Sequence, residues 1–355
     1  MKPTAFVTSD LSPAQLDRLT QRCQVRQGGW GYTGTRLTPE ELVSAAVEAE
    51  ILLIGYESLA GRVIQALPRL RLIGCTRSTP VNVDLAAATL RRIPVLHTPG
   101  RNTQTAAEFT LGLMLAGAHH IARAHCALRR GLYLGAPASD FSIADHSGDV
   151  TWDMDGKSPF KDFQGFELAG RCLGIIGLGK IGSRVAQLAQ AFDMRVISYS
   201  PHSSSSEADA LYVQLVDLDT LLQEADFISV HANVTSETWK MLGRREFNLM
   251  KPSTYLINIS RAAIIDQAAL IEALQQGHIA GAALDVFWFE PLPANHPLLT
   301  LENVTITPHL AGATQEVKER HSRMIVDDVF AWLDGRRPTC VANPEVWALD
   351  RDKTD

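Results

Sequence analysis

Three residues in the last third of the chain are of types that together could hold an acid and move a proton: Arg261, Glu290 and His309. Each follows a short apolar run that is typical of a buried strand, and these runs are residues 255–259, 282–286 and 304–307, respectively. In an open α/β sheet the carboxyl ends of the strands line the ligand crevice, so we expect the three side chains to converge there.

These three residue types suit the reduction of a 2-oxo acid. Histidine can give or take the proton of the carbonyl oxygen near neutral pH. A neighbouring carboxylate favours the imidazolium and orients the ring. Arginine offers two forked donors to a substrate carboxylate and polarises the carbonyl. Taken singly, the three could be an ion-pair partner, a loop charge and a packed histidine. Their order and the motif described next favour the catalytic interpretation.

A glycine motif precedes this set in the chain. Gly177, Gly179 and Gly182 form G-x-G-x-x-G, with Lys180 and Ile181 inside it, directly after the apolar run 172–176 and before a helical run at 183–192. The glycines permit a tight turn, close approach of the backbone to a pyrophosphate, and close helix–strand packing. The free N–H groups of the helix start then bind the phosphates. This strand–turn–helix context predicts a dinucleotide site rather than a mere tight turn.

The acid that usually follows such a motif by about 20 residues is missing, because Ser200 occupies that place after the predicted strand 194–198. Without a carboxylate, a 2′-phosphate is not repelled. No Arg or Lys stands in residues 200–206 to attract that phosphate either. The cofactor is therefore predicted to be NAD or NADP, with NAD slightly favoured.

Five blocks in this order resemble the D-isomer-specific 2-hydroxyacid dehydrogenase family, and its phosphoglycerate-dehydrogenase-like branch in particular. The blocks are residues 74–84, residues 97–108, the glycine motif, residues 229–238, and the three segments that contain Arg261, Glu290 and His309. The resemblance implies that Arg261 binds substrate, Glu290 supports His309, and His309 is the acid/base. It also implies that the loop containing Arg77, Ser78 and Thr79 binds the substrate carboxylate.

The same resemblance implies several cofactor contacts beyond the glycine motif. Asp285 would bond the nicotinamide carboxamide, and His231 lies in a block similar to the family's histidine-containing cofactor loop. Thr105 lies in a block similar to the segment near the nicotinamide. The family usually has Pro where Asn233 stands, so the loop after His231 could sit differently here.

Arg77 has two possible roles. If it points into the cleft, it could add a second positive anchor for a phosphorylated or dicarboxylic substrate. If it points outward, it is an ordinary surface charge. The sequence does not choose between these alternatives.

Alternating strand and helix patterns run through most of the chain and predict parallel sheets covered by helices on both faces. Ser12 with Pro13 and Thr38 with Pro39 read as helix starts, and Thr105 with Glu108 as the capping box of a long helix that continues to about Arg130. Residues 132–166 lack periodicity and could be an arm, a lid or a loop.

The family's fold then implies two Rossmann-like or flavodoxin-like doubly wound domains with a cleft between them. The substrate domain would take residues 1–103 with 316–355, and the NAD(P)-binding domain residues 104–315. Family members are typically homodimers joined through the nucleotide domains.

Composition excludes several other classes of protein. Of 355 residues, 46% are hydrophobic and 20% charged, and the net charge of −6 offers no basic surface for nucleic acid or membranes. No apolar run approaches the roughly 20 residues of a membrane helix, and no signal peptide is recognisable. Five cysteines without C-x-x-C spacing favour a reducing cytoplasm, with no disulfide framework and no metal site.

Two functions are therefore weighed. The first is an oxidoreductase that transfers a hydride between NAD(P)H and a small D-2-hydroxy acid or 2-oxo acid. The alternative is an NADH-binding redox sensor with little turnover, similar to the family's corepressors. No low-complexity tail follows Ala348, which favours the enzyme.

Overall fold

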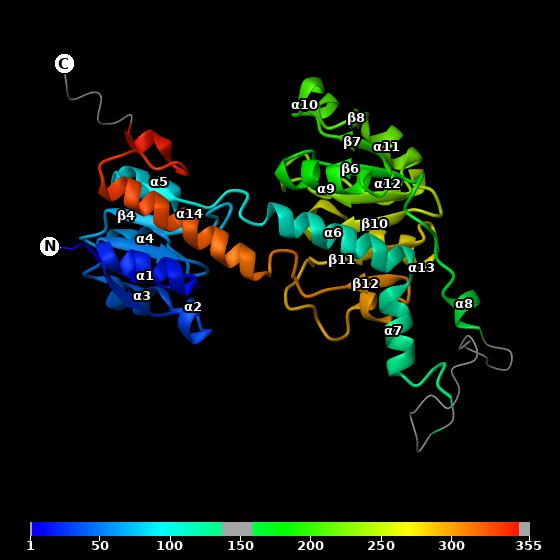
Figure 1. Ribbon diagram of the computed structural model, residues 1–355, viewed down its shortest axis with the longest axis horizontal. Helices are drawn as coiled ribbons and strands as arrows, with labels where there is room; N and C mark the ends of the chain where they lie inside the picture. Colours follow the sequence, from blue (N-terminus) through cyan, green and yellow to red (C-terminus); the bar gives the residue numbers. More distant parts are fainter. Residues whose placement is uncertain (1, 136, 138–157, 348–355) are drawn as a thin grey trace, which may run out of the picture. The chain divides into compact units, whose positions relative to one another are not determined.

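A computed structural model describes residues 2–135, 137 and 158–347 of the chain. The chain divides into two compact units. Unit 1 comprises Met1–Asn102 and Ala313–Asp355, and unit 2 comprises Thr103–Gly312. Each unit is built on one parallel sheet with helices packed against it, as Figure 1 shows.

The sheet of unit 1 has five parallel strands in the order β2-β1-β3-β4-β5. From β1 the chain adds β2 on one side of the sheet, and then β3, β4 and β5 on the other side. The switch point between β1 and β3 is of the flavodoxin-like kind. The strands are β1 (Thr4–Val7), β2 (Gln24–Gln27), β3 (Ile51–Ile54), β4 (Leu72–Cys75) and β5 (Val95–Leu96).

Successive side chains of each strand point to opposite faces of this sheet, so apolar side chains stand on both faces. Helices cover both faces and bury these side chains. One core contains Leu52 and Ile54 together with residues of α3, α4 and α5. The other contains Ile51 and Leu53 together with α1 and α14, so the C-terminal helix completes unit 1. The helices are α1 (Pro13–Arg22), α2 (Trp30–Thr33), α3 (Pro39–Ala46), α4 (Gly61–Gln65), α5 (Leu85–Leu90) and α14 (Gln315–Leu333).

The sheet of unit 2 has seven parallel strands in the order β12-β11-β10-β9-β6-β7-β8. This is the strand order of a Rossmann fold with one further strand, and its switch point lies between β6 and β9. The strands are β6 (Cys172–Ile176), β7 (Arg195–Tyr199), β8 (Gln214–Leu215), β9 (Phe227–Val230), β10 (Tyr255–Asn258), β11 (Gly281–Leu284) and β12 (Val304–Ile306).

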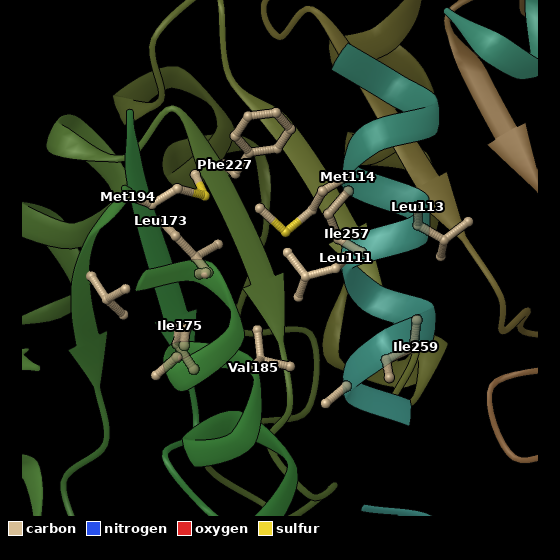
Figure 2. Packing of buried hydrophobic residues seen from close by; sticks show 14 of the residues in the cluster. Leu111, Leu113, Met114, Leu173, Ile175, Val185, Met194, Phe227, Ile257 and Ile259 are labelled. Carbon is tan, nitrogen blue, oxygen red and sulfur yellow. The ribbon is translucent and has the colours of Figure 1, made fainter. Parts of the chain in front are cut away.

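Two hydrophobic cores cover the two faces of this sheet. Figure 2 shows one of them, where Leu111 and Met114 of α6 pack toward Leu173 and Phe227. The opposite core contains residues of α11, α12 and α13. The helices of unit 2 are α6 (Thr103–Ala118), α7 (Ile121–Arg129), α8 (Pro159–Asp162), α9 (Lys180–Gln190), α10 (Ser205–Asp209), α11 (Leu218–Glu224), α12 (Arg244–Leu249) and α13 (Gln267–Gln275), with 3₁₀ turns η1 (Ala262–Ile264) and η2 (Pro297–Thr300).

The long helix predicted from Thr105 and Glu108 ends near Arg130 as expected, but the prediction is wrong at its start and in its continuity. α6 begins at Thr103, so Thr105 is a buried helical residue and not a cap. The helix also divides at His120, which has a φ of 53°. At this break the carbonyl oxygen of Ala118 accepts from the backbone N–H of Phe166 at 3.1 Å, and Phe166 is distant in sequence. A local pattern cannot reveal such a contact.

Other local predictions differ in smaller ways. Ser12 precedes α1 as predicted, but its side chain makes no capping hydrogen bond. Its backbone N–H donates to Ser322 Oγ of α14 at 2.9 Å. Thr38 does form the predicted type of capping box, with Glu41. Strands β2 and β8 were not predicted, because β2 is largely exposed and β8 has two residues.

Most of the aperiodic stretch 132–166 lies outside the described residues, so its proposed roles as an arm, lid or loop stay open. Among the helices in the described part of the chain, none combines the length and apolar character that crossing a bilayer requires.

We expect Phe227→Ala to lower the free energy of unfolding of unit 2 by about 3–5 kcal/mol, because it removes a fully buried ring from the core. The ring lies 5.7 Å from that of Phe166, centroid to centroid. Phe160→Ala is the control, since Phe160 is 77% exposed and its loss should change stability by less than about 0.5 kcal/mol. Denaturant unfolding of both variants checks this, and equal effects would contradict the described core.

Candidate active site

The residues predicted to do chemistry in unit 2 all follow strands that are neighbours in one parallel sheet. Their carboxyl ends lie at the same edge, which is where open α/β sheets bind ligands. From one side of the sheet to the other, the residues and the strands they follow are His309 after β12, Asp285 and Glu290 after β11, Arg261 after β10, His231 after β9, Gly177 after β6 and Ser200 after β7.

His309 and Glu290 form a direct pair. The Nδ1 atom of His309 lies 2.8 Å from Glu290 Oε2. A carboxylate can only accept, so Nδ1 carries the proton and Nε2 is the second, available nitrogen. The other oxygen of Glu290 accepts from the backbone N–H of Phe287 at 3.1 Å, which fixes the carboxylate.

Asp285 holds the loop that carries His309. Its buried carboxylate accepts from Thr307 Oγ1 at 2.6 Å, from the backbone N–H of Leu310 at 2.7 Å and from that of Ala311 at 2.8 Å. These donors lie on both sides of His309 in the chain. His309 has a φ of 58°, in the left-handed region that a residue with a Cβ adopts at some cost. The three hydrogen bonds therefore keep His309 in a backbone conformation that it would not favour by itself.

Arg261 lies in the turn that follows β10. The buried side chain of Asn258 organises this turn: its Oδ1 accepts from the backbone N–H of Ser260 at 3.0 Å, and its Nδ2 donates to the carbonyl of Arg261 at 3.0 Å. The guanidinium of Arg261 is exposed and donates to the carbonyl of Ser260 at 2.6 Å. Among the described contacts none joins Arg261 to Glu290 or His309, so the structure pairs two of the three predicted residues directly and places the third on the adjacent strand end.

The glycine loop fits a dinucleotide. Gly177 has a φ of 97°, and a Cβ there would lie 2.8 Å from the backbone nitrogen of Ala232. A Cβ at Gly182 would lie 2.2 Å from the carbonyl oxygen of Gly177, whereas Gly179 faces open space. Helix α9 begins at Lys180 and Ile181 without a side-chain cap, so its first N–H groups remain free for phosphate oxygens.

Ser200 makes hydrogen bonds inside this loop. Its hydroxyl accepts from the backbone N–H of Leu178 at 3.1 Å and lies 2.9 Å from Ser203 Oγ. Ser200 thereby connects the strand end of β7 to the glycine loop.

His231 follows β9 and lies beside the glycine loop. Its backbone N–H donates to the carbonyl of Ile176 at 2.8 Å, and its Nε2 lies 2.8 Å from Ser229 Oγ. Burial of the ring lowers the pKa of His231 to about 4, so the ring is neutral at physiological pH.

The predicted substrate loop lies in unit 1, after β4. Arg77 and Ser78 are half-buried and Thr79 is exposed. The carbonyl of Ser78 accepts from His97 Nδ1 at 2.8 Å, and that of Arg77 accepts from the backbone N–H of Thr98 at 3.0 Å. These bonds fix the loop against the strand end of β5.

Two supporting residues were missed by sequence reasoning: Asn258, which shapes the turn of Arg261, and Thr307, which bonds Asp285. Their short distance in sequence from Arg261 and His309 is the signal that could have identified them. Within the described residues, no group of three or more His, Cys, Asp or Glu side chains could hold a metal ion.

The strand order and the glycine loop of unit 2 define a dinucleotide-binding α/β protein. Comparison with known proteins identifies it further. A family model described as "D-isomer specific 2-hydroxyacid dehydrogenase, NAD binding domain" matches residues 111–311. The chain belongs to this family, and it is an NAD(P)-dependent 2-hydroxyacid dehydrogenase.

Individual relatives support this membership. A glyoxylate reductase from Korarchaeum cryptofilum is 34% identical over 347 residues, which cover 98% of this chain and 97% of that protein. A D-3-phosphoglycerate dehydrogenase from Methanocaldococcus jannaschii is 37% identical over 311 residues, 87% of this chain and 54% of that protein. The crystal structure of the TT0316 protein from Thermus thermophilus has a TM-score of 0.80 and 34% identity, and covers 96% of this chain and 99% of its own.

The low pKa of His231 predicts a pH dependence of stability. In the unfolded chain His231 binds a proton with the ordinary pKa of 6.5, whereas in the folded protein its pKa is about 4. Because the unfolded state binds more protons in this range, the free energy of unfolding falls as the pH decreases through it.

We expect His231→Gln to reduce the slope of the free energy of unfolding against pH between 6.5 and about 4. Thermal or denaturant unfolding without cofactor measures this slope. The control is His278→Gln, which changes an exposed histidine of the same unit. If His231→Gln and wild type keep the same slope, the buried ring is not its source.

Proposed function

We propose that this enzyme reduces a small 2-oxo acid to the D-2-hydroxy acid, with His309 as acid/base, Glu290 as its supporting carboxylate and Arg261 as the substrate-binding cation. The observation that carries this proposal is the 2.8 Å hydrogen bond between His309 Nδ1 and Glu290 Oε2 at the carboxyl edge of the dinucleotide-binding sheet.

The cofactor would be held by residues of unit 2. The N–H groups at the start of α9, with Lys180 and Ile181, suit its pyrophosphate, and Ser200 lies where the adenosine ribose is bound in such folds. Thr105, His231 and Asp285 are the further cofactor contacts that we propose. When bound, a reduced nicotinamide supplies the hydride for C2 of the substrate.

The chain's own residues supply the proton. With Nδ1–H donating to Glu290, His309 in its protonated form offers the proton on Nε2 to the carbonyl oxygen, which becomes the hydroxyl of the product. The Glu290 carboxylate stabilises the positive charge of the ring before this transfer. In the reverse direction, Nε2 takes the hydroxyl proton.

Arg261 would bind the carboxylate of the substrate and polarise its carbonyl, because a guanidinium presents parallel N–H donors that match two oxygens. Its one described hydrogen bond is to a backbone carbonyl, which leaves donors for a substrate. Arg77, Ser78 and Thr79 in unit 1 are proposed as further substrate contacts.

The substrate class follows from the relatives, which are named for glyoxylate and 3-phosphoglycerate. We propose glyoxylate, hydroxypyruvate or a phosphorylated analogue as the substrate. The homodimer expected from the family remains a prediction, which light scattering of the purified chain can check.

We expect His309→Ala to lower kcat with these 2-oxo acids by about a hundredfold or more, because it removes the proton donor. His278→Ala, at an exposed histidine of the same unit, is the control and should keep full activity. Glu290→Gln should cause a smaller loss, because the amide oxygen still accepts from Nδ1–H while the negative charge is lost. Oxidation of NADH and NADPH followed by absorbance measures these effects. Full turnover of His309→Ala would exclude His309 from the proton transfer.

We propose that NAD is slightly favoured over NADP, because no Arg or Lys stands within residues 200–206 to bind a 2′-phosphate. Ser200→Asp should raise the NADH:NADPH ratio of kcat/KM by about tenfold or more, since a carboxylate bonds the ribose hydroxyls and repels the phosphate. Ser200→Ala is the control for loss of the hydroxyl alone. If the two variants give the same ratio, Ser200 is not at the ribose.

A further inference from the structure

The segment that carries Glu290 is tied to the turn that carries Arg261 by a tryptophan. Trp288 follows β11, and its indole Nε1 donates to the carbonyl oxygen of Ile265 at 3.1 Å. Ile265 lies shortly after Arg261 in the chain and is fully buried. An indole N–H can only donate, and a buried one is normally paired. This hydrogen bond therefore joins the loops that follow two neighbouring strands of unit 2, β10 and β11.

The acceptor of this bond belongs to a fixed part of the Arg261 turn. The 3₁₀ turn η1 follows Arg261, and the backbone N–H of Ile265 donates to the carbonyl of Ala262 at 2.9 Å. Leu242 pairs with Ile265 in a parallel β-bridge, and its carbonyl accepts from the N–H of Asp266 at 2.9 Å. The indole is thus bonded to a carbonyl that other backbone contacts already hold in place.

The ring of Trp288 also packs on the body of unit 2. Trp288 and its neighbour Phe287 are half-buried against the core that contains residues of α11, α12 and α13. The next residue, Phe289, is 67% exposed, and Glu290 after it is exposed as well. Trp288 therefore fixes this loop from the inside, at a position close in sequence to the carboxylate that bonds His309.

Glu290 depends on the loop for its position relative to His309. Half of the His309 side chain and 38% of that of Glu290 are exposed, so packing does not hold the pair together. The second bond of the carboxylate comes from the N–H of Phe287, which lies in the same loop and moves with it. Among the described residues, no other side-chain hydrogen bond joins residues 261–266 to residues 286–291. A shift of this loop would carry the carboxylate away from His309 Nδ1.

We propose that Trp288 is a positioning residue for the proton transfer: its indole N–H anchors the loop of Glu290 to the Arg261 turn and keeps the carboxylate within hydrogen-bond reach of His309. This inference rests on the proposed function, in which His309 is the acid/base. It assigns the role to the hydrogen-bonding atom of the tryptophan and not to the bulk of its ring, and this distinction decides the choice of variants.

Two substitutions separate the hydrogen bond from the packing. Trp288→Phe keeps a large aromatic ring against the core and removes the N–H donor. Trp288→His keeps a five-membered ring with an N–H at the corresponding position and loses the second ring. Trp332→Phe is the control, because Trp332 is a half-buried tryptophan of unit 1 whose indole makes no described hydrogen bond.

Nitrogen NMR of the histidine-labelled full chain, without cofactor, tests the position of Glu290 directly. The signals of His309 are assigned by their loss in His309→Ala, and spectra are recorded at alkaline pH, where an imidazole is neutral. In the wild type, in Trp332→Phe and in Trp288→His we expect the ring proton on Nδ1, because Glu290 accepts from it. In Trp288→Phe we expect this preference for Nδ1 to be lost.

Turnover measures the consequence for the reaction. Trp288→Phe should lower kcat by about tenfold or more and leave KM within about twofold, because His309 loses its support while Arg261 keeps its turn. Trp288→His should retain most of the wild-type kcat. In a Glu290→Ala background, Trp288→Phe should change kcat by less than about twofold, because a residue that acts through Glu290 then has no carboxylate to position.

An equal loss of kcat from Trp288→Phe with and without Glu290, or a greater disturbance by Trp288→His than by Trp288→Phe, would overturn the proposal. If Trp288→Phe does not fold, the NMR signal of Trp288→His decides: a proton kept on Nδ1 of His309 supports the anchor, and its loss overturns it. Failure of the proposed function looks different. In that case the wild type reduces no 2-oxo acid with either cofactor, while the His309 signal still responds to Trp288→Phe.

Discussion

The carboxyl edge of the sheet in unit 2 depends on one buried carboxylate. Asp285 accepts three hydrogen bonds from residues on both sides of His309, and this is the interaction that keeps His309 in the left-handed region. Glu290 reaches the ring from the same strand end and bonds its Nδ1. Two carboxylates that follow β11 thus divide the task, because one sets the backbone of the histidine and the other sets the orientation of its ring.

Both units obey the same constraint on where polar groups can stand. Their central parallel strands are buried on both faces, so most polar side chains of these strands stand at the strand ends. At a switch point, helices leave the strand ends in opposite directions and the edge stays open. Unit 2 has a glycine loop at that position, whereas unit 1 has basic side chains and buried hydroxyls. The proposed chemistry of the protein follows from this difference between two similar sheets.

The sequence predicted most of this arrangement where the signals are local. The apolar run 172–176 became a buried strand with the same bounds, because a strand buried on both faces has little room for polar residues. The strand ends predicted that Glu290 and His309 lie near each other, and the family resemblance implied that Glu290 supports His309; the two side chains are hydrogen-bonded in the structure. The pair Arg101–His321 had no local signal, since 220 residues separate its members. The three donors to Asp285 include two backbone N–H groups, whose directions depend on the turn and not on residue type.

The return of α14 to unit 1 affects how the chain is made. Ile325, Val326 and Val329 of this helix cover the sheet face that contains Ile51 and Leu53, and they are synthesised after all of unit 2. At the usual rates of translation the ribosome needs about 10–40 s for the roughly 200 intervening residues. During that time the N-terminal segment of unit 1, residues 1–102, exposes apolar surface, while unit 2, which is continuous in sequence, can complete its own core. The nascent chain can therefore form its nucleotide-binding unit before unit 1, whose sheet keeps one apolar face uncovered until α14 has been synthesised.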